Sequence, residues 1–148
     1  MKIMTTATTT PIPTIAVFPE EKLTLDQKIE KWVWQLCRSL EQNYQSKYPN
    51  YDEEGNAHIN IRIKFRMELG RKYWKIIQQD YDTFQDRNEY RDGSVHAFVD
   101  RNTGEVYKPA SWKSPAKIVR YDLRLISDRA KLHDPNYTDW AGGYLYLR

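Results

Sequence analysis

The stretch of sequence that decides the fold is residues 57–67, AHINIRIKFRM. Its apolar residues alternate with polar ones; they are Ile59, Ile61, Ile63, Phe65 and Met67. Because successive side chains of a strand point to opposite faces, this alternation predicts a half-buried β-strand. One face would be apolar, and the other would carry Arg62, Lys64 and Arg66.

Residues 24–48 offer a partner for the apolar face. Apolar residues recur there every three or four positions, as on one side of a helix; they are Leu25, Ile29, Trp32, Val33, Leu36, Cys37, Leu40 and Tyr44. Thr24 and Gln27 fit a capping box at the start, and Pro49 follows the end. Trp34 lies off this stripe and is either a second contact or an exposed ring.

Further strands are predicted downstream, at residues 73–78, 94–100 and 105–108. The first is rich in aromatic and β-branched residues and follows a reversal at residues 69–71. The other two form a hairpin closed by Gly104, with Asp100 accepting backbone N–H groups in the turn. This loop length sets Phe98 opposite Tyr107 and Val99 opposite Val106. Residues 79–93 are polar and predict an acidic loop or hairpin end.

The last third of the chain has mixed signals. Ser114 and Pro115 favour a short helical turn at residues 115–118, and the alternation after them favours extended chain up to residue 125. Residues 134–136 predict a turn, and residues 144–147 predict a last strand.

Together these elements predict an α+β fold, with a long N-terminal helix packed on a mostly antiparallel sheet of four or five strands. The domain would span residues 24–148, and residues 1–23 would be an N-terminal arm, either flexible or bound to a partner. The arm carries apolar residues that a free tail seldom has; they are Ile12, Ile15, Val17 and Phe18. A charge at Ile61 should unfold such a domain.

Composition narrows the classes of protein. The chain has 148 residues and 40% hydrophobic residues, enough for one domain with a core. A single Cys excludes an internal disulfide and a Cys-based zinc site, and no apolar run is long enough for a membrane span or a secretory signal. The net charge of +3 is too small to indicate a nucleic-acid partner by itself.

Residues 94–117 read SVHAFVDRNTGEVYKPASWKSPAK. This segment resembles one found in small, mostly uncharacterised bacteriophage proteins, cyanophage ones included. The likeness extends loosely to residues 72–77 and to the C-terminal GGYLYL. It implies a phage origin and the same β-hairpin module, but no catalytic residue.

Catalytic motifs are weak. Glu105 and Lys108 are three apart, whereas the carboxylate–lysine ending of one nuclease class needs a spacing of two to share a strand face. The acidic residues within 80–92 sit beside Arg87 and Arg91, which favours a solvated loop over a metal site. No two of the three histidines have a metal-ligand spacing, and Cys37 lies on the apolar stripe. The chain is therefore predicted not to be an enzyme and to need no metal or cofactor.

Basic residues interleaved with aromatic ones are the remaining signal. Residues 57–76 and 108–124 are both strongly basic, and cations with stacking rings are typical of nucleic-acid binding. The solvated face of a sheet would give the same pattern. The predicted nucleic-acid-binding residues are Arg62, Lys64, Arg66, Tyr107, Lys108, Trp112, Lys113, Lys117 and Arg120.

The predicted function is that of a non-enzymatic bacteriophage accessory protein that binds nucleic acid or a nucleotide through this surface. The alternative is a protein-binding module, either a virion component or an inhibitor of a host protein, that uses the apolar arm. Either role places the protein in the host cytoplasm or the virion.

Overall fold

A helix and an antiparallel sheet organise the computed structural model, which describes residues 14–147. The helices are α1 (Leu25–Lys47) and α2 (Ile126–Leu132), with short 3-10 turns at η2 (Thr14–Val17), η3 (Glu20–Lys22), η4 (Phe84–Asp86) and η5 (Gly143–Leu145). The strands are β1 (Asn50–Tyr51), β2 (Ala57–His58), β3 (Ile63–Leu69), β4 (Tyr73–Asp82), β5 (Glu89–Asp100), β6 (Glu105–Tyr107) and β7 (Tyr121–Asp122).

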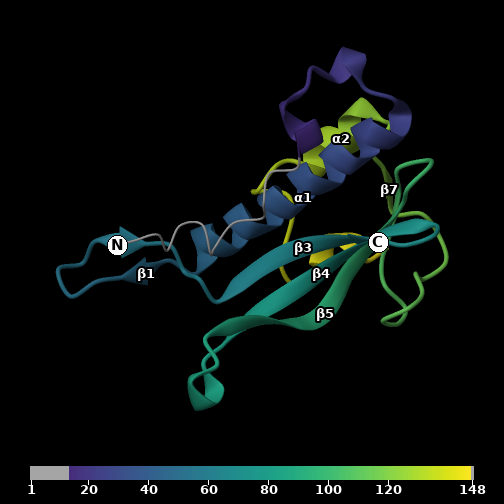
Figure 1. Ribbon diagram of the computed structural model, residues 1–148. Helices are drawn as coiled ribbons and strands as arrows, with labels where there is room; N and C mark the ends of the chain where they lie inside the picture. The colour runs from purple at the N-terminus through teal and green to yellow at the C-terminus, as the bar shows by residue number, and fades with distance from the viewer. Residues whose placement is uncertain (1–13, 148) are drawn as a thin grey trace.

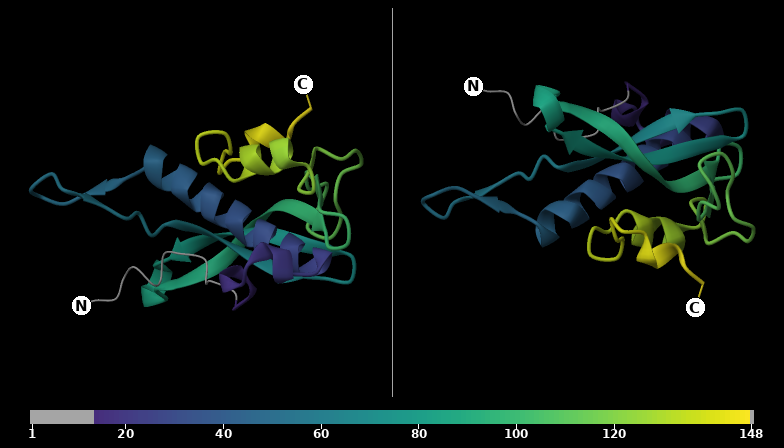
Figure 2. Two further views of the ribbon diagram at one scale, coloured as in Figure 1. Left: turned by 90° about the horizontal axis from the view of Figure 1, so that it is seen from above. Right: turned by 90° about the horizontal axis from the view of Figure 1, so that it is seen from below.

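The main sheet has five antiparallel strands in the order β3-β4-β5-β6-β7, and α1 packs on one face of it (Figure 1). This confirms the predicted α+β class. The segment that contains α2 and η5 runs along one side of α1, and the strands lie along the other (Figure 2). A second sheet, the two-stranded β1–β2 hairpin, projects away from the body (Figures 1 and 2).

The α1 helix begins as predicted. Thr24 accepts the Gln27 backbone N–H, and the Gln27 side chain accepts the Thr24 backbone N–H. The core joins its apolar stripe to alternate residues of β3, β4 and β5. From α1 come Ile29, Trp32, Val33, Leu36, Cys37, Leu40 and Tyr44, and from the three strands come Ile63, Phe65, Ile76, Ala97 and Val99. Trp34 lies half-buried off this stripe, with the Arg38 guanidinium 5.8 Å from its ring centroid.

The predicted strand 57–67 is interrupted at residues 59–62. There the backbone of Asn60 bonds to the Gln45 side chain of α1 instead of to another strand. The Asn60 N–H donates to Gln45 Oε1 at 2.7 Å, and Gln45 Nε2 donates to the Asn60 carbonyl at 2.6 Å. Ile59 is 45% exposed and Ile61 only half-buried, so neither belongs to the core. The expectation that both meet the helix stripe was therefore wrong, and so was the choice of Ile61 as a core position.

The β5–β6 hairpin has the predicted register, with Phe98 opposite Tyr107 and Val99 opposite Val106. Asp100 accepts the backbone N–H groups of Asn102 and Thr103, and Gly104 has a φ of +80°. The polar residues 79–93 are mostly the ends of β4 and β5, so the structure has a long hairpin there rather than a loop.

Three predictions near the C-terminus were wrong. Residues 115–118 form no helical turn, because Pro115 bridges to Pro109 and Ile118 has a φ of +74°. Of the extended chain predicted at residues 119–125, only the two residues of β7 form a strand, and the helix α2 follows at Ile126. Residues 143–145 are the 3-10 turn η5 rather than a strand.

The predicted arm is described only in part, since residues 1–13, with Ile12, lie outside the described residues. The rest packs near the start of α1, where Glu20 accepts a 2.9 Å hydrogen bond from the Trp32 indole. Val17 and Phe18 stay exposed, at 72% and 50%.

Candidate functional site

One member of the predicted basic row on β3, Arg66, is paired with carboxylates of the same chain. The Arg66 guanidinium donates to Asp92 of β5 at 2.6 Å and to Glu68 at 3.1 Å. The hydrogen bond from Arg66 lowers the pKa of Asp92, as expected for a carboxylate that is paired with a cation. Arg66 therefore offers little free charge to a phosphate.

The other two members of the row have no ion pair among the described residues but lie in different surroundings. The Lys64 ammonium lies 4.1 Å from the ring centroid of Tyr90, in cation–π contact. Arg62 precedes the strand and lines a cavity beside the end of α1. The three cations thus have three different environments.

Two predicted residues of the segment 108–120 have structural roles. Arg120 donates to the carbonyls of Leu145 at 2.7 Å and Lys117 at 2.8 Å, which ties the C-terminal segment to the sheet. Lys108 donates to the carbonyl of its neighbour Pro109 at 3.5 Å, and its ammonium lies 4.9 Å from the Tyr146 ring centroid.

Two further predicted site residues lie nearby in the sequence. Tyr107 is half-buried, and its ring meets Tyr73 edge to face. Lys117 is exposed.

A different group of cations surrounds one small cavity of about 180 Å³, which we term the basic pocket. It is lined by Glu68, Gly70, Arg71, Lys72, Tyr73, Lys75, Phe98 and Lys113. Its carboxylate, Glu68, is already paired with Arg66. Four cations therefore face this cavity against a single carboxylate, which bonds to Arg66.

Two connections bring these cations together. The turn between β3 and β4, closed by a 2.8 Å hydrogen bond from Gly70 to Tyr73, carries Arg71 and Lys72. The loop after β6 is closed by the Pro109–Pro115 bridge and by Ser111, whose hydroxyl accepts the Lys113 N–H at 3.3 Å. Each connection is local in sequence, but their proximity depends on the whole sheet.

Trp112 stands beside the basic pocket. The Lys75 ammonium lies 5.3 Å from the Trp112 ring and 5.7 Å from the Phe98 ring. Trp112 is 45% exposed, so it keeps free surface for a planar group, whereas Phe98 is buried. Of the predicted site residues, Trp112 and Lys113 lie at this pocket; Arg71, Lys72 and Lys75 were noted only as part of a basic stretch. The predicted reversal at residues 69–71 could have pointed to Arg71 and Lys72, because a turn places the cations next to it on the surface.

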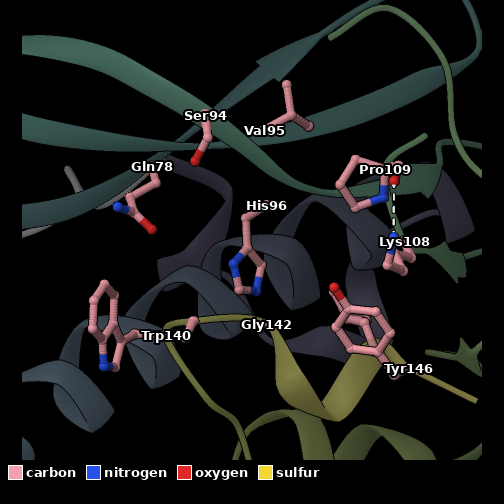
Figure 3. A pocket seen from close by; sticks show the side chains of 11 residues that line it. Gln78, Ser94, Val95, His96, Lys108, Pro109, Trp140, Gly142 and Tyr146 are labelled. Carbon is pink, nitrogen blue, oxygen red and sulfur yellow. Dashed lines mark hydrogen bonds between the residues drawn. The ribbon is translucent and has the colours of Figure 1, made fainter. Parts of the chain in front are cut away.

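A second hollow lies on the opposite face of the sheet, beside the C-terminal segment. Figure 3 shows this cavity of about 130 Å³, with His96 between Trp140 and Gln78 on one side and Tyr146 and Lys108 on the other. Trp140 and Gln78 also line a larger cavity of about 400 Å³ next to the end of α1.

His96 is buried at this hollow and bonds through Nε2 to the Tyr144 hydroxyl at 2.8 Å. Burial lowers the pKa of His96 to about 4. The imidazole is therefore neutral at physiological pH. Sequence reasoning did not single out this residue, because an isolated His has no spacing signal.

Residues 14–147 contain no group of three or more His, Cys, Asp or Glu side chains placed to hold a metal ion. No helix in this range is both long and apolar enough to cross a membrane.

Comparison with known proteins assigns the chain to a family. The model of DUF7717, a family of unknown function, matches residues 16–147. No curated protein and no solved structure matches the chain.

Proposed function

The chain belongs to DUF7717, a family of unknown function, and from the basic pocket we propose that it binds single-stranded nucleic acid. The observation that carries this proposal is the set of four cations around one cavity whose carboxylate is already paired. Cations of this kind neutralise phosphates and release counterions, which supplies affinity independent of sequence.

The neighbouring aromatic ring favours a single strand over a duplex. Trp112 is half-exposed next to Lys75, and a free base can stack on such a ring for about 1–3 kcal/mol. The cavity of about 180 Å³ holds less than a typical ligand pocket of about 300–1,000 Å³. It therefore suits a phosphate with its base outside better than a whole nucleotide. We propose that this binding serves a non-enzymatic accessory role in a bacteriophage.

Fluorescence anisotropy with a labelled oligonucleotide of about 20 residues, DNA or RNA, tests the proposal over a salt series. The triple variant Lys72→Gln, Lys75→Gln, Lys113→Gln should bind about 10–50-fold more weakly at low salt. Its dependence on log salt should be shallower by about two, since each lost phosphate contact on a single strand removes about 0.7 from the slope. Trp112→Ala should weaken binding about tenfold with the slope unchanged.

The matched control changes the same number of lysines on the helical layer: Lys22→Gln, Lys28→Gln, Lys31→Gln. It alters the net charge equally, so general attraction falls by the same amount. The proposal is wrong if neither nucleic acid binds at low salt, or if this control loses as much affinity as the pocket variant. A mononucleotide that binds as tightly as the oligonucleotide would contradict the polymer as ligand.

A second candidate function rests on the N-terminal segment. Val17 and Phe18 expose apolar surface beside α1, and such residues next to each other suit a protein partner. We propose this protein-binding role as the alternative. Removal of residues 1–23 should then abolish capture of a partner while the basic-pocket variant retains it.

A further inference from the structure

The larger cavity beside the end of α1 is separate from the basic pocket. Its lining includes Ile63 and the aromatic rings of Tyr44, Tyr48 and Trp140. Ile63 is part of the core under α1, whereas Lys75 of the basic pocket alternates with the core residue Ile76 and faces the other side of the sheet. A ligand here would therefore not use the proposed nucleic-acid site.

Three aromatic rings form a corner in this cavity. The Trp140 ring stands edge-on to Tyr44 and Tyr48, with centroids 5.1 and 5.7 Å away and interplanar angles of 81° and 87°. Tyr44 and Tyr48 are one helical turn apart, at 5.2 Å. Tyr48 is 48% exposed and Trp140 is half-buried, so these two rings keep surface open to a ligand, whereas Tyr44 is buried. Aromatic faces attract cations, alkylated ammonium groups above all.

Two opposite charges line the same cavity, Arg62 and Asp80. Asp80 is paired across the sheet with Ile63, the residue after Arg62, so the two side chains start close together. Among residues 14–147, neither side chain has an ion pair within 4.0 Å. Both residues are exposed.

Gly93 makes room for the Asp80 carboxylate. A Cβ at position 93 would lie 2.5 Å from Asp80 Oδ2, closer than atoms can approach. Alanine at this position would therefore displace the carboxylate without removing its charge. The Gly93→Ala variant therefore tests whether the position of the Asp80 carboxylate matters for binding.

We infer that this cavity binds a small zwitterion with an ammonium and a carboxylate group, such as an amino acid or a betaine. The ammonium would lie against the aromatic corner and Asp80, and the carboxylate would accept hydrogen bonds from the Arg62 guanidinium. A ligand with only a positive charge would leave Arg62 without a partner and be repelled by it. A ligand with only a negative charge would in the same way be repelled by Asp80. The volume of about 400 Å³ lies at the small end for ligand pockets.

Isothermal titration calorimetry with four probes tests this: glycine betaine, L-phenylalanine, tetramethylammonium and acetate. The better zwitterion should bind at least about tenfold more tightly than either singly charged ion, a difference of about 1.4 kcal/mol, because each single ion leaves one of the two charged residues without a partner. The order of the two zwitterions tells whether the ammonium is methylated or bare. The inference is overturned if no zwitterion binds, or if tetramethylammonium or acetate binds equally well.

Three variants locate the site. Asp80→Asn and Arg62→Gln should each weaken zwitterion binding about tenfold, and Gly93→Ala should weaken it by moving the carboxylate. Asp86→Asn is the matched control, because it makes the same change at an exposed aspartate in the β4–β5 turn. Thermal melts check that each variant is folded. If folded Asp80→Asn and Arg62→Gln both bind like the wild type, the zwitterion lies elsewhere and the assignment fails.

Discussion

Phe65→Ala should lower the free energy of unfolding by about 3–5 kcal/mol. The side chain is fully buried in the core between the sheet and α1, and its ring meets His96 edge to face at 5.2 Å. Alanine would remove the transfer free energy of the ring and leave a cavity that close-packed neighbours fill only in part. Urea denaturation followed by circular dichroism measures this loss. It is a substantial part of the stability of an ordinary domain, about 5–15 kcal/mol.

Ile61→Ala provides the comparison, because it shortens an apolar side chain in the same alternating stretch. Ile61 lies in the break before β3 and is only half-buried, so its truncation should cost about 1 kcal/mol. Equal losses for the two variants would contradict this arrangement. They would mean that the apolar alternation continues into the core through residue 61, as the sequence pattern suggested.

Local patterns predicted the parts of the fold that depend on nearby residues. The capping box at Thr24, the helix that follows it and the turn at Gly104 need only a few adjacent residues, and all three are confirmed. The register of the β5–β6 hairpin follows from its loop length. The strand around residues 57–67 was predicted with the wrong start, because Gln45 on α1 competes for the backbone of Asn60.

Contacts between distant segments decided what the sequence could not show. Arg66 has an alternating position typical of a solvated face, but its partner Asp92 lies 26 residues away on β5. Lys72 and Lys113 lie on connections far apart in sequence, and only the sheet brings them to one cavity. The resemblance of residues 94–117 to phage proteins implied a β-hairpin but identified no functional site. The phage origin that it implies stays a prediction.

Acid should destabilise the protein through His96, by about 3 kcal/mol in full. The folded-state pKa of about 4 lies below the ordinary value of 6.5, so the unfolded chain binds the proton more tightly. The stabilising contribution is therefore complete above about pH 6.5 and is lost as the pH falls towards 4. Urea denaturation at pH 7 and at pH 4.5 should show that His96→Gln loses about 2 kcal/mol less than the wild type over this interval.

Lys117→Gln is the control, because Lys117 lies exposed and its replacement leaves all three histidines in place. Its loss between the two pH values should match that of the wild type, since carboxylates such as Asp92 titrate in both proteins. An acid response of His96→Gln that equals the wild type would show that the buried imidazole is not the group responsible.

Tyr144→Phe tests whether burial or the hydrogen bond to Tyr144 causes the lowered pKa of His96. The Tyr144 hydroxyl is the partner of His96 Nε2, so its removal should cost about 1–2 kcal/mol at pH 7. Burial is the main cause of the lowered pKa of His96, and phenylalanine keeps the imidazole buried. The variant should therefore be less stable at every pH and still lose stability between pH 6.5 and 4. A Tyr144→Phe variant whose stability no longer changed in that range would assign the effect to the hydroxyl instead.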